Sequence, residues 1–113
     1  MTAALTLIVF EIAALICVAF AIPLLRRQVP PNRWFGFRTP STVRDPALWY
    51  EVNYRAGVDL LVTGLLLAAC AAILFVAEAN LSVFWIVCTI LLGFGPIYMT
   101  IHGFMVIRRS RRD

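Results

Sequence analysis

Three long apolar runs dominate the pattern of hydrophobic and polar positions along this chain. They cover residues 5–25, 57–77 and 82–107. At about 1.5 Å of rise per residue, a helix as long as either of the first two runs reaches about 32 Å, enough to cross a hydrocarbon core of about 30 Å. Pro96 predicts a kink or tilt in the third run, because proline leaves a carbonyl one turn earlier unpaired. The pattern therefore predicts an all-α integral membrane protein with three transmembrane helices, built as one domain over residues 1–113.

The segments between the runs predict how the helices are connected. Residues 78–81 form a tight link, so the second and third runs are expected to form a helical hairpin. The connection over residues 26–56 is too long for a turn, and loops of that length are usually functional or disordered. Its second half is expected to begin a helix, because Asp45 can cap a helix and Pro46 suits a first helical position. That helix either runs straight into the second apolar run or lies against it.

The composition excludes an ordinary water-soluble domain. Hydrophobic residues make up 62% of the chain and charged residues 14%, with a mean hydropathy of +0.88. A soluble fold needs more charge than this to cover its surface. The three cysteines, Cys17, Cys70 and Cys88, lie inside the apolar runs at a spacing that matches no metal site. They are therefore expected to be small lipid- or core-facing residues.

The basic residues are all arginines. All of them lie in segments that share one side of the membrane if each of the three runs crosses it. Because they flank apolar stretches and form no single soluble face, the net charge of +4 is attributed to membrane topology and not to nucleic-acid binding. The positive-inside rule then predicts a multi-pass protein with its amino terminus outside and its carboxyl terminus in the cytoplasm. The connection holds Arg26, Arg27, Arg33, Arg38, Arg44 and Arg55, and the tail holds Arg108, Arg109, Arg111 and Arg112.

Aromatic residues concentrate in the 26–56 connection, which argues against disorder. Rings at this density are typical of the membrane interface, where they sit at headgroup depth. The connection is therefore expected to be an ordered loop and helix in contact with membrane lipid. The aromatic residues are Trp34, Phe35, Phe37, Trp49, Tyr50 and Tyr54.

A set of residues in and after this connection resembles the signature of the SdpI family of bacterial immunity membrane proteins. An Asn-x-x-x-Gly-x-Arg-Thr-Pro core is followed by a tryptophan, an asparagine and a glycine, and the resemblance extends over residues 25–107. The resemblance implies that the site residues are those of this motif. They are Asn32, Trp34, Gly36, Arg38, Thr39, Pro40, Trp49, Asn53 and Gly57.

The resemblance also implies a function. The founding member of the family protects bacterial cells from a secreted, membrane-active peptide toxin and holds a repressor at the membrane. It carries further amino-terminal spans that this sequence does not show. A short member would be a non-enzymatic immunity, resistance or sensing protein of the plasma membrane, with a peptide toxin or a cytoplasmic regulator as its partner. Two other functions stay open: an accessory subunit of a larger membrane complex, and a component of an enzyme or transporter that binds lipid phosphate.

Three ionisable residues interrupt the apolar runs: Glu11, Asp59 and His102. An ionisable side chain inside a span costs about 3 kcal/mol, so each of them needs a partner or a use. Glu11 either hydrogen-bonds a neighbouring helix, contacts a partner protein or an incoming peptide, or belongs to a proton relay. Glu11 interrupts the first run, and no basic residue precedes that run. Both features argue against a cleaved signal peptide.

Asp59 and His102 are expected at similar depth, about one turn inside the cytoplasmic boundary and close to Arg55. One interpretation is a paired Asp–His or Asp–Arg cluster that locks the loop against the bundle. The other is a headgroup- or phosphate-binding pocket built with Arg38. His102 is the only histidine, and the sequence shows no catalytic triad, phosphate loop or metal cluster. Neither an enzymatic activity nor a cofactor is therefore expected.

Stripes of small residues on the first two runs predict close packing between these helices. At about 100° per residue, Glu11 lies about 160° from Ala13, so the first run has two faces suited to protein contacts. Three helices bury little on their own, and a homo-oligomer or a larger complex is therefore expected. The stripes are Ala13, Cys17 and Ala21 on the first run and Gly64, Ala68 and Ala72 on the second.

Overall fold

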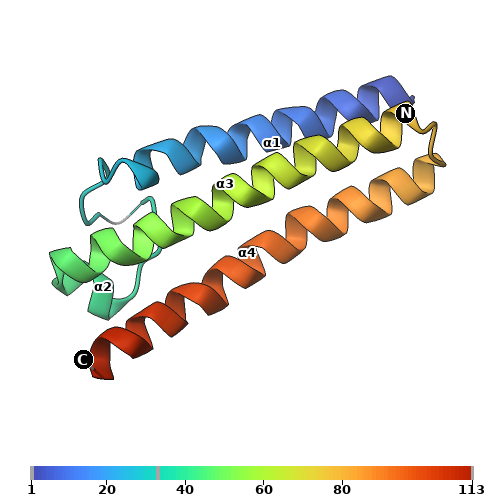
Figure 1. Cartoon of the computed structure of the whole chain (residues 1–113). Coiled ribbons are helices and arrows are strands. Elements are labelled where there is room, and N and C mark those ends of the chain that lie inside the picture. The colour runs from blue at the N-terminus through green and yellow to red at the C-terminus, as the bar shows by residue number, and fades with distance from the viewer. Residues whose placement is uncertain (1, 33, 113) are drawn as a thin grey trace.

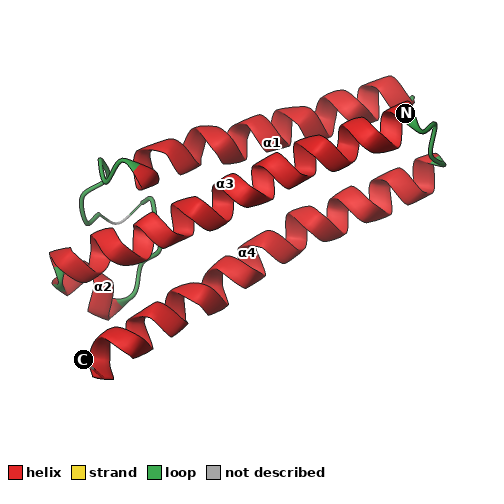
Figure 2. Cartoon of the chain, viewed as in Figure 1, coloured by secondary structure: helices red, strands yellow, loops and turns green. Residues whose placement is uncertain are grey.

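The computed structural model describes residues 2–32 and 34–112, so Arg33 of the expected arginine set lies outside the described residues. The elements of this part of the chain are all helices: α1 (Ala3–Leu25), α2 (Pro40–Arg44), α3 (Pro46–Val76) and α4 (Leu81–Arg112), as Figure 1 and Figure 2 show. α1, α3 and α4 are each long and apolar enough to cross a membrane. The predicted all-α architecture with three transmembrane helices is confirmed.

α3 is longer than the second apolar run, because it begins inside the connection. One carboxylate oxygen of Asp45 accepts hydrogen bonds from the backbone N–H groups of Ala47 at 3.1 Å and Leu48 at 3.3 Å. Pro46 occupies the first helical position, where its missing N–H costs nothing. The interfacial helix therefore runs straight into the second span, and the alternative in which it lies against that span is wrong.

α1 and α3 pack closely through small residues. A Cβ built at Gly64 would lie 3.0 Å from the carbonyl oxygen of Ala14 and 3.0 Å from Cγ2 of Val18. A Cβ built at Gly57 would lie 3.0 Å from Cβ of Leu24. The expected close approach of the two helices is confirmed, and it brings in Ala14, which the predicted stripe did not include.

α3 and α4 form the expected hairpin. Glu78 adopts a left-handed backbone conformation with φ 54°, and Oδ1 of Asn80 then accepts a hydrogen bond from the backbone N–H of Ser82 at 2.9 Å. This side chain satisfies one of the free N–H groups at the start of α4. Pro96 lies inside α4 and does not end it, because α4 is assigned as one helix from Leu81 to Arg112.

The three long helices lie in a flat row with α3 between α1 and α4 (Figure 1). The principal extents of the molecule are 50, 24 and 18 Å. α4 packs mainly on α3 and touches α1 where the ring centroid of Phe10 lies 5.0 Å from that of Trp85. A flat row leaves much of the surface of each helix uncovered by protein, so that surface is available to contact lipid.

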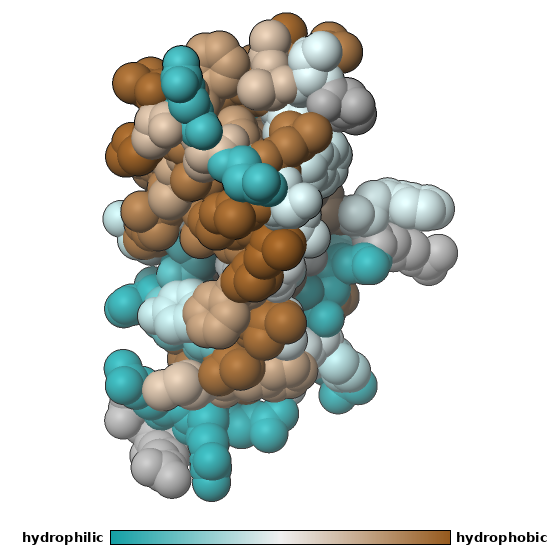
Figure 3. Space-filling view, turned by 90° about the vertical axis from the view of Figure 1, so that its right-hand side faces the viewer, coloured by the Kyte–Doolittle hydropathy of each residue, from teal (hydrophilic) through white to brown (hydrophobic). Residues whose placement is uncertain are grey.

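The two ends of this row differ in polarity. The amino terminus and the α3–α4 link lie at one end, whereas the loop, α2 and the carboxyl terminus lie at the other (Figure 1). Every arginine that the structure describes belongs to the half of the molecule nearer the loop. Figure 3 shows apolar side chains over most of the upper part of one face and hydrophilic side chains gathered mainly below.

Gly64→Val tests the contact between α1 and α3. The added side chain must displace the backbone of α1, so we expect a loss of about 1–3 kcal/mol in the free energy of unfolding from overpacking. A thermal melt of the purified protein in mild detergent measures the loss as a lower Tm. Gly93→Val is the matched control, because nothing lies within 4 Å of a Cβ built there. Its effect should stay within about 0.5 kcal/mol, and equal Tm values for the two variants would contradict the close contact.

Candidate functional site

One buried asparagine of α3 holds the loop that precedes α2 against this helix. Oδ1 of Asn53 accepts a hydrogen bond from the backbone N–H of Phe37 at 2.6 Å. Nδ2 of Asn53 donates to the carbonyl oxygens of Phe37 at 3.3 Å and Trp49 at 3.0 Å. A buried polar group left unpaired costs about 1–3 kcal/mol, so the amide stabilises the loop by satisfying both backbone groups of one residue. We call the contacts among Gly36, Phe37, Trp49 and Asn53 the loop clamp.

Gly36 allows the loop to come this close to α3. Its φ of +105° lies in the left-handed region that favours glycine, and a Cβ there would lie 2.6 Å from Oδ1 of Asn53. Trp49 is fully buried and donates its Nε1–H to the carbonyl oxygen of Val29 at 2.7 Å. The loop clamp therefore joins the chain just after α1, the middle of the loop and the first turns of α3.

Two local turns give the loop its shape. Oδ1 of Asn32 accepts hydrogen bonds from two backbone N–H groups of the turn that follows it, both at 2.8 Å. Thr39 caps α2 in a reciprocal capping box with Thr42, and Pro40 occupies the first turn. These three motif residues, Asn32, Thr39 and Pro40, are therefore used to shape the loop.

The side chains of two motif residues make no hydrogen bond or ion pair within the described part of the loop. Trp34 is 90% exposed. Arg38 is also exposed, and no hydrogen bond or ion pair joins its side chain to the part of the chain that the structure describes. Gly57, the last motif residue, lies in the α1–α3 contact instead. Trp34 and Arg38 are thus free to contact something outside the chain.

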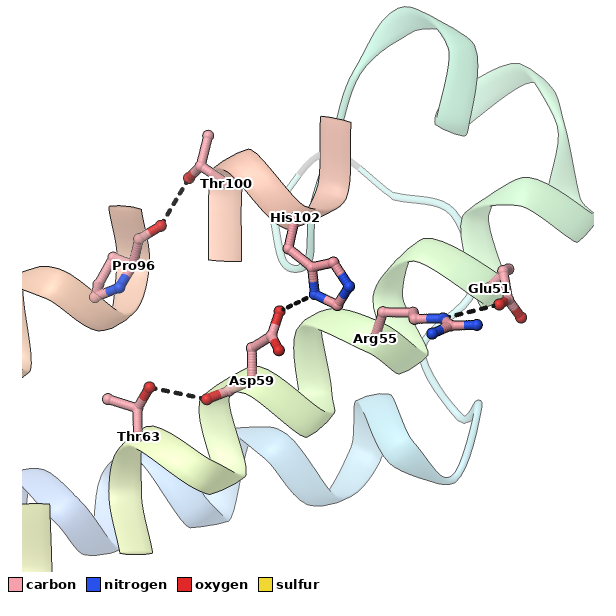
Figure 4. Close-up of polar contacts among 7 residues, drawn as sticks. All are labelled: Glu51, Arg55, Asp59, Thr63, Pro96, Thr100 and His102. Atoms are coloured by element: carbon pink, nitrogen blue, oxygen red, sulfur yellow. Dashed lines mark hydrogen bonds and ion pairs between the residues drawn. The ribbon is translucent and has the colours of Figure 1, made fainter. Parts of the chain in front are cut away.

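Asp59 of α3 and His102 of α4 point toward one another (Figure 4). Nδ1 of His102 lies 2.7 Å from Oδ2 of Asp59, and the two side chains are 27% and 10% exposed respectively. The expected Asp–His cluster is confirmed, but it joins α3 to α4 and does not hold the loop. Arg55 instead bonds to Glu51 through Nε at 3.1 Å (Figure 4), so the Asp–Arg alternative is wrong.

Arg38 does not share a pocket with Asp59 and His102. It lines a hollow of about 440 Å³ between the loop and α4, whose α4 wall includes Phe104. At about 100° per residue, Phe104 points about 160° away from His102 on α4. The two polar sites therefore lie on different sides of α4, and the interpretation that combined them in one phosphate pocket is wrong.

Glu11 brings an unpaired oxygen into the apolar part of the bundle. Its Oε1 is buried and has no hydrogen-bond partner among the residues described. The preceding residue, Phe10, packs against Phe84 and Trp85 of α4. The expected hydrogen bond from this oxygen to a neighbouring helix is therefore not made within the single chain.

Three contacts near the loop were missed from the sequence. Nη2 of Arg111 donates to Oγ of Ser41 at 2.6 Å and ties the end of α4 to α2 across 70 positions of sequence, for which no motif gives a signal. Arg27 lies 4.9 Å from the ring centroid of Tyr54 and 3.7 Å from the carboxylate of Glu51.

In the described part of the chain, no group of three or more His, Cys, Asp or Glu side chains could hold a metal ion.

Asn53→Leu tests the loop clamp. Leucine is similar in size but cannot pair with the backbone of Phe37, so we expect a loss of about 1–3 kcal/mol for each backbone group left unpaired. The released loop should be cut faster by trypsin after Arg38 and Arg44 in mild detergent. Asn80→Ala is the control, because it removes an asparagine cap at the other end of the molecule. Unchanged cleavage of the loop in Asn53→Leu would show that the clamp does not order it.

Comparison with known proteins agrees with the motif. The model of the SdpI/YfhL protein family matches residues 28–100, which contain the loop clamp, Trp34, Arg38 and Asp59. No curated protein and no solved structure matches the chain. The family match covers more than half of the 113 residues, and the chain therefore belongs to the SdpI/YfhL protein family.

Proposed function

We propose that this membrane protein of the SdpI family gives resistance to, or senses, a membrane-active peptide, without catalysing a reaction. The observation that supports this role is the unpaired Oε1 of Glu11 in the apolar part of α1. An ionisable residue inside a span is a candidate functional site by default, because burying it is costly unless it has a partner.

A membrane-active peptide could supply the hydrogen-bond donor that Oε1 of Glu11 lacks. Such a peptide places N–H groups and basic side chains inside the bilayer, and a carboxylate is a strong acceptor for both. The flat row of helices leaves α1 open to a helix that inserts beside it, since Ile8, Ile12 and Leu15 are all more than half exposed. A second copy of the chain is the other partner that could meet this face.

The loop would then report or stabilise the bound state. The side chains of Trp34 and Arg38 are exposed and make no hydrogen bond or ion pair to the described part of the chain, so they are available to a regulator. The loop clamp keeps the segment between them in a fixed backbone conformation. A fixed segment loses less conformational entropy on binding than a flexible one.

The resistance role is tested by deleting the gene and challenging cells with a panel of membrane-active peptides. We expect sensitivity to at least one peptide to rise and to be restored by the wild-type protein but not by Glu11→Leu. A lost hydrogen bond to a charged group is worth about 1.5–3 kcal/mol, which corresponds to about 10- to 100-fold in affinity. Glu11→Leu should keep the wild-type Tm or raise it, because it removes an unpaired buried oxygen.

Ile16→Ala is the matched control for Glu11→Leu. Ile16 is 50% exposed and lies about 140° around α1 from Glu11, so it should restore resistance. Unchanged sensitivity of the deletion strain to the whole panel would contradict the resistance role. Full restoration by Glu11→Leu would show that Glu11 is not the contact.

We also propose that the loop and the carboxyl terminus face the cytoplasm of a bacterial cell. The clustering of the arginines at the loop end supports this orientation through the positive-inside rule. With Cys17, Cys70 and Cys88 replaced by alanine, a cysteine at Val43 should react with an impermeant maleimide only after the cells are opened. A cysteine at Ala77, in the α3–α4 link, should react in intact cells. The reverse pattern of labelling would overturn the orientation.

A further inference from the structure

Two neighbouring hollows lie along the side of α4 that faces the loop. One hollow of about 440 Å³ lies between the loop and α4, and a second of about 480 Å³ lies between α2 and the end of α4. Thr39 and Phe104 line both hollows, so the two adjoin at these side chains. We call the two hollows together the loop–α4 groove.

The groove changes from apolar to basic along its length. Leu24, Leu60 and Met99 line the end that lies deeper in the bundle. Arg108 and Arg111 line the end beside α2. From Met99 to Arg111 the groove follows α4 for about 18 Å at 1.5 Å of rise per residue.

The basic end carries charge that nothing in its walls neutralises. The lining residues that the structure describes include no aspartate or glutamate. Arg38 lines the hollow between the loop and α4, so both hollows carry guanidinium groups. Ser41 holds Arg111 over the basic end through the 2.6 Å hydrogen bond to Nη2. The other donors of this guanidinium remain available, because arginine carries five N–H groups.

We propose that the loop–α4 groove binds a phospholipid with an anionic headgroup. Its phosphate would lie between Arg108 and Arg111, because guanidinium groups match phosphate oxygens in charge and geometry. One acyl chain would lie over Phe104 toward Leu60 and Met99. The groove lies along the carboxyl-terminal end of α4, a helix long and apolar enough to cross a membrane, and at such an end both parts of a phospholipid are at hand.

The other side of α4 provides a matched control. Arg109 lines a separate hollow of about 350 Å³ with His102 and Tyr98, away from the loop. Arg109 and Arg111 are both exposed and lie in the last turns of α4, about 160° apart around its axis. Replacing either one removes the same charge from the same end of the molecule, but only Arg111 belongs to the groove.

The test is lipid retention by the purified full chain in neutral detergent, measured by native mass spectrometry with added phosphatidylglycerol or phosphatidylcholine. We expect the wild-type protein to retain phosphatidylglycerol in preference. Arg111→Gln should weaken that retention about fivefold, the effect of one basic residue near an anionic surface, and Arg109→Gln should leave it nearly unchanged. Equal losses in the two variants, or equal retention of the two lipids by the wild-type protein, would overturn the site.

Two further measurements separate a lipid from a free phosphate. Thr100→Trp fills the groove without changing its charge, because the exposed Thr100 lines the hollow between the loop and α4. It should lower phosphatidylglycerol retention while leaving the Tm close to that of the wild-type protein.

In the second measurement, inorganic phosphate and glycerol 3-phosphate should not displace the lipid at millimolar concentration. Displacement by either, or full retention in Thr100→Trp, would show that the groove binds a free phosphate and not a lipid. The outcome does not depend on the resistance role, since no peptide is present.

Discussion

The pairing of the Asn53 amide with the backbone of Phe37 is the interaction on which the rest of the loop depends. Where a loop folds onto a helix, the backbone N–H and C=O groups at the contact are removed from water and need partners from the protein. The side-chain amide carries a donor and an acceptor and satisfies both groups of one residue. It can do so only because Gly36 has no Cβ to block the approach. The Asn32 turn and the capping box of α2 then shape the segments on either side of this fixed point.

The spans could be predicted from the sequence because hydropathy and length report directly on the bilayer. The start of α3 was also predictable, since Asp45 and Pro46 are local signals that need no tertiary information. Gly36, Trp49 and Asn53 were named as site residues only through the family resemblance, and the contacts of the loop clamp were not predicted. Nothing in the periodicity of α3 shows that the side chain of Asn53 meets a backbone group 16 positions away.

The polar residues of the spans show where reasoning from depth succeeds and where it fails. Depth along the helices correctly brought Asp59 and His102 together, because antiparallel neighbours place such residues at the same level. Depth says nothing about direction around a helix, so it could not exclude the alternative that placed Arg38 in one pocket with Asp59 and His102. Depth also failed for Arg55. This side chain pairs with Glu51, four residues earlier on the same helix, and not with Asp59.

The separation of the two polar sites has a consequence for how the molecule can respond to a ligand. The Asp59–His102 pair fixes α4 on α3 from one side, so a molecule in the loop–α4 groove on the other side need not break that pair. Leu24 lines the groove and also packs on Gly57, so the end of α1 forms part of the groove wall. α1 is one helix from Ala3 to Leu25 and carries Glu11 toward its other end. Any shift of α1 along α3 that accompanies binding at Glu11 must therefore move Leu24 and change the shape of the groove.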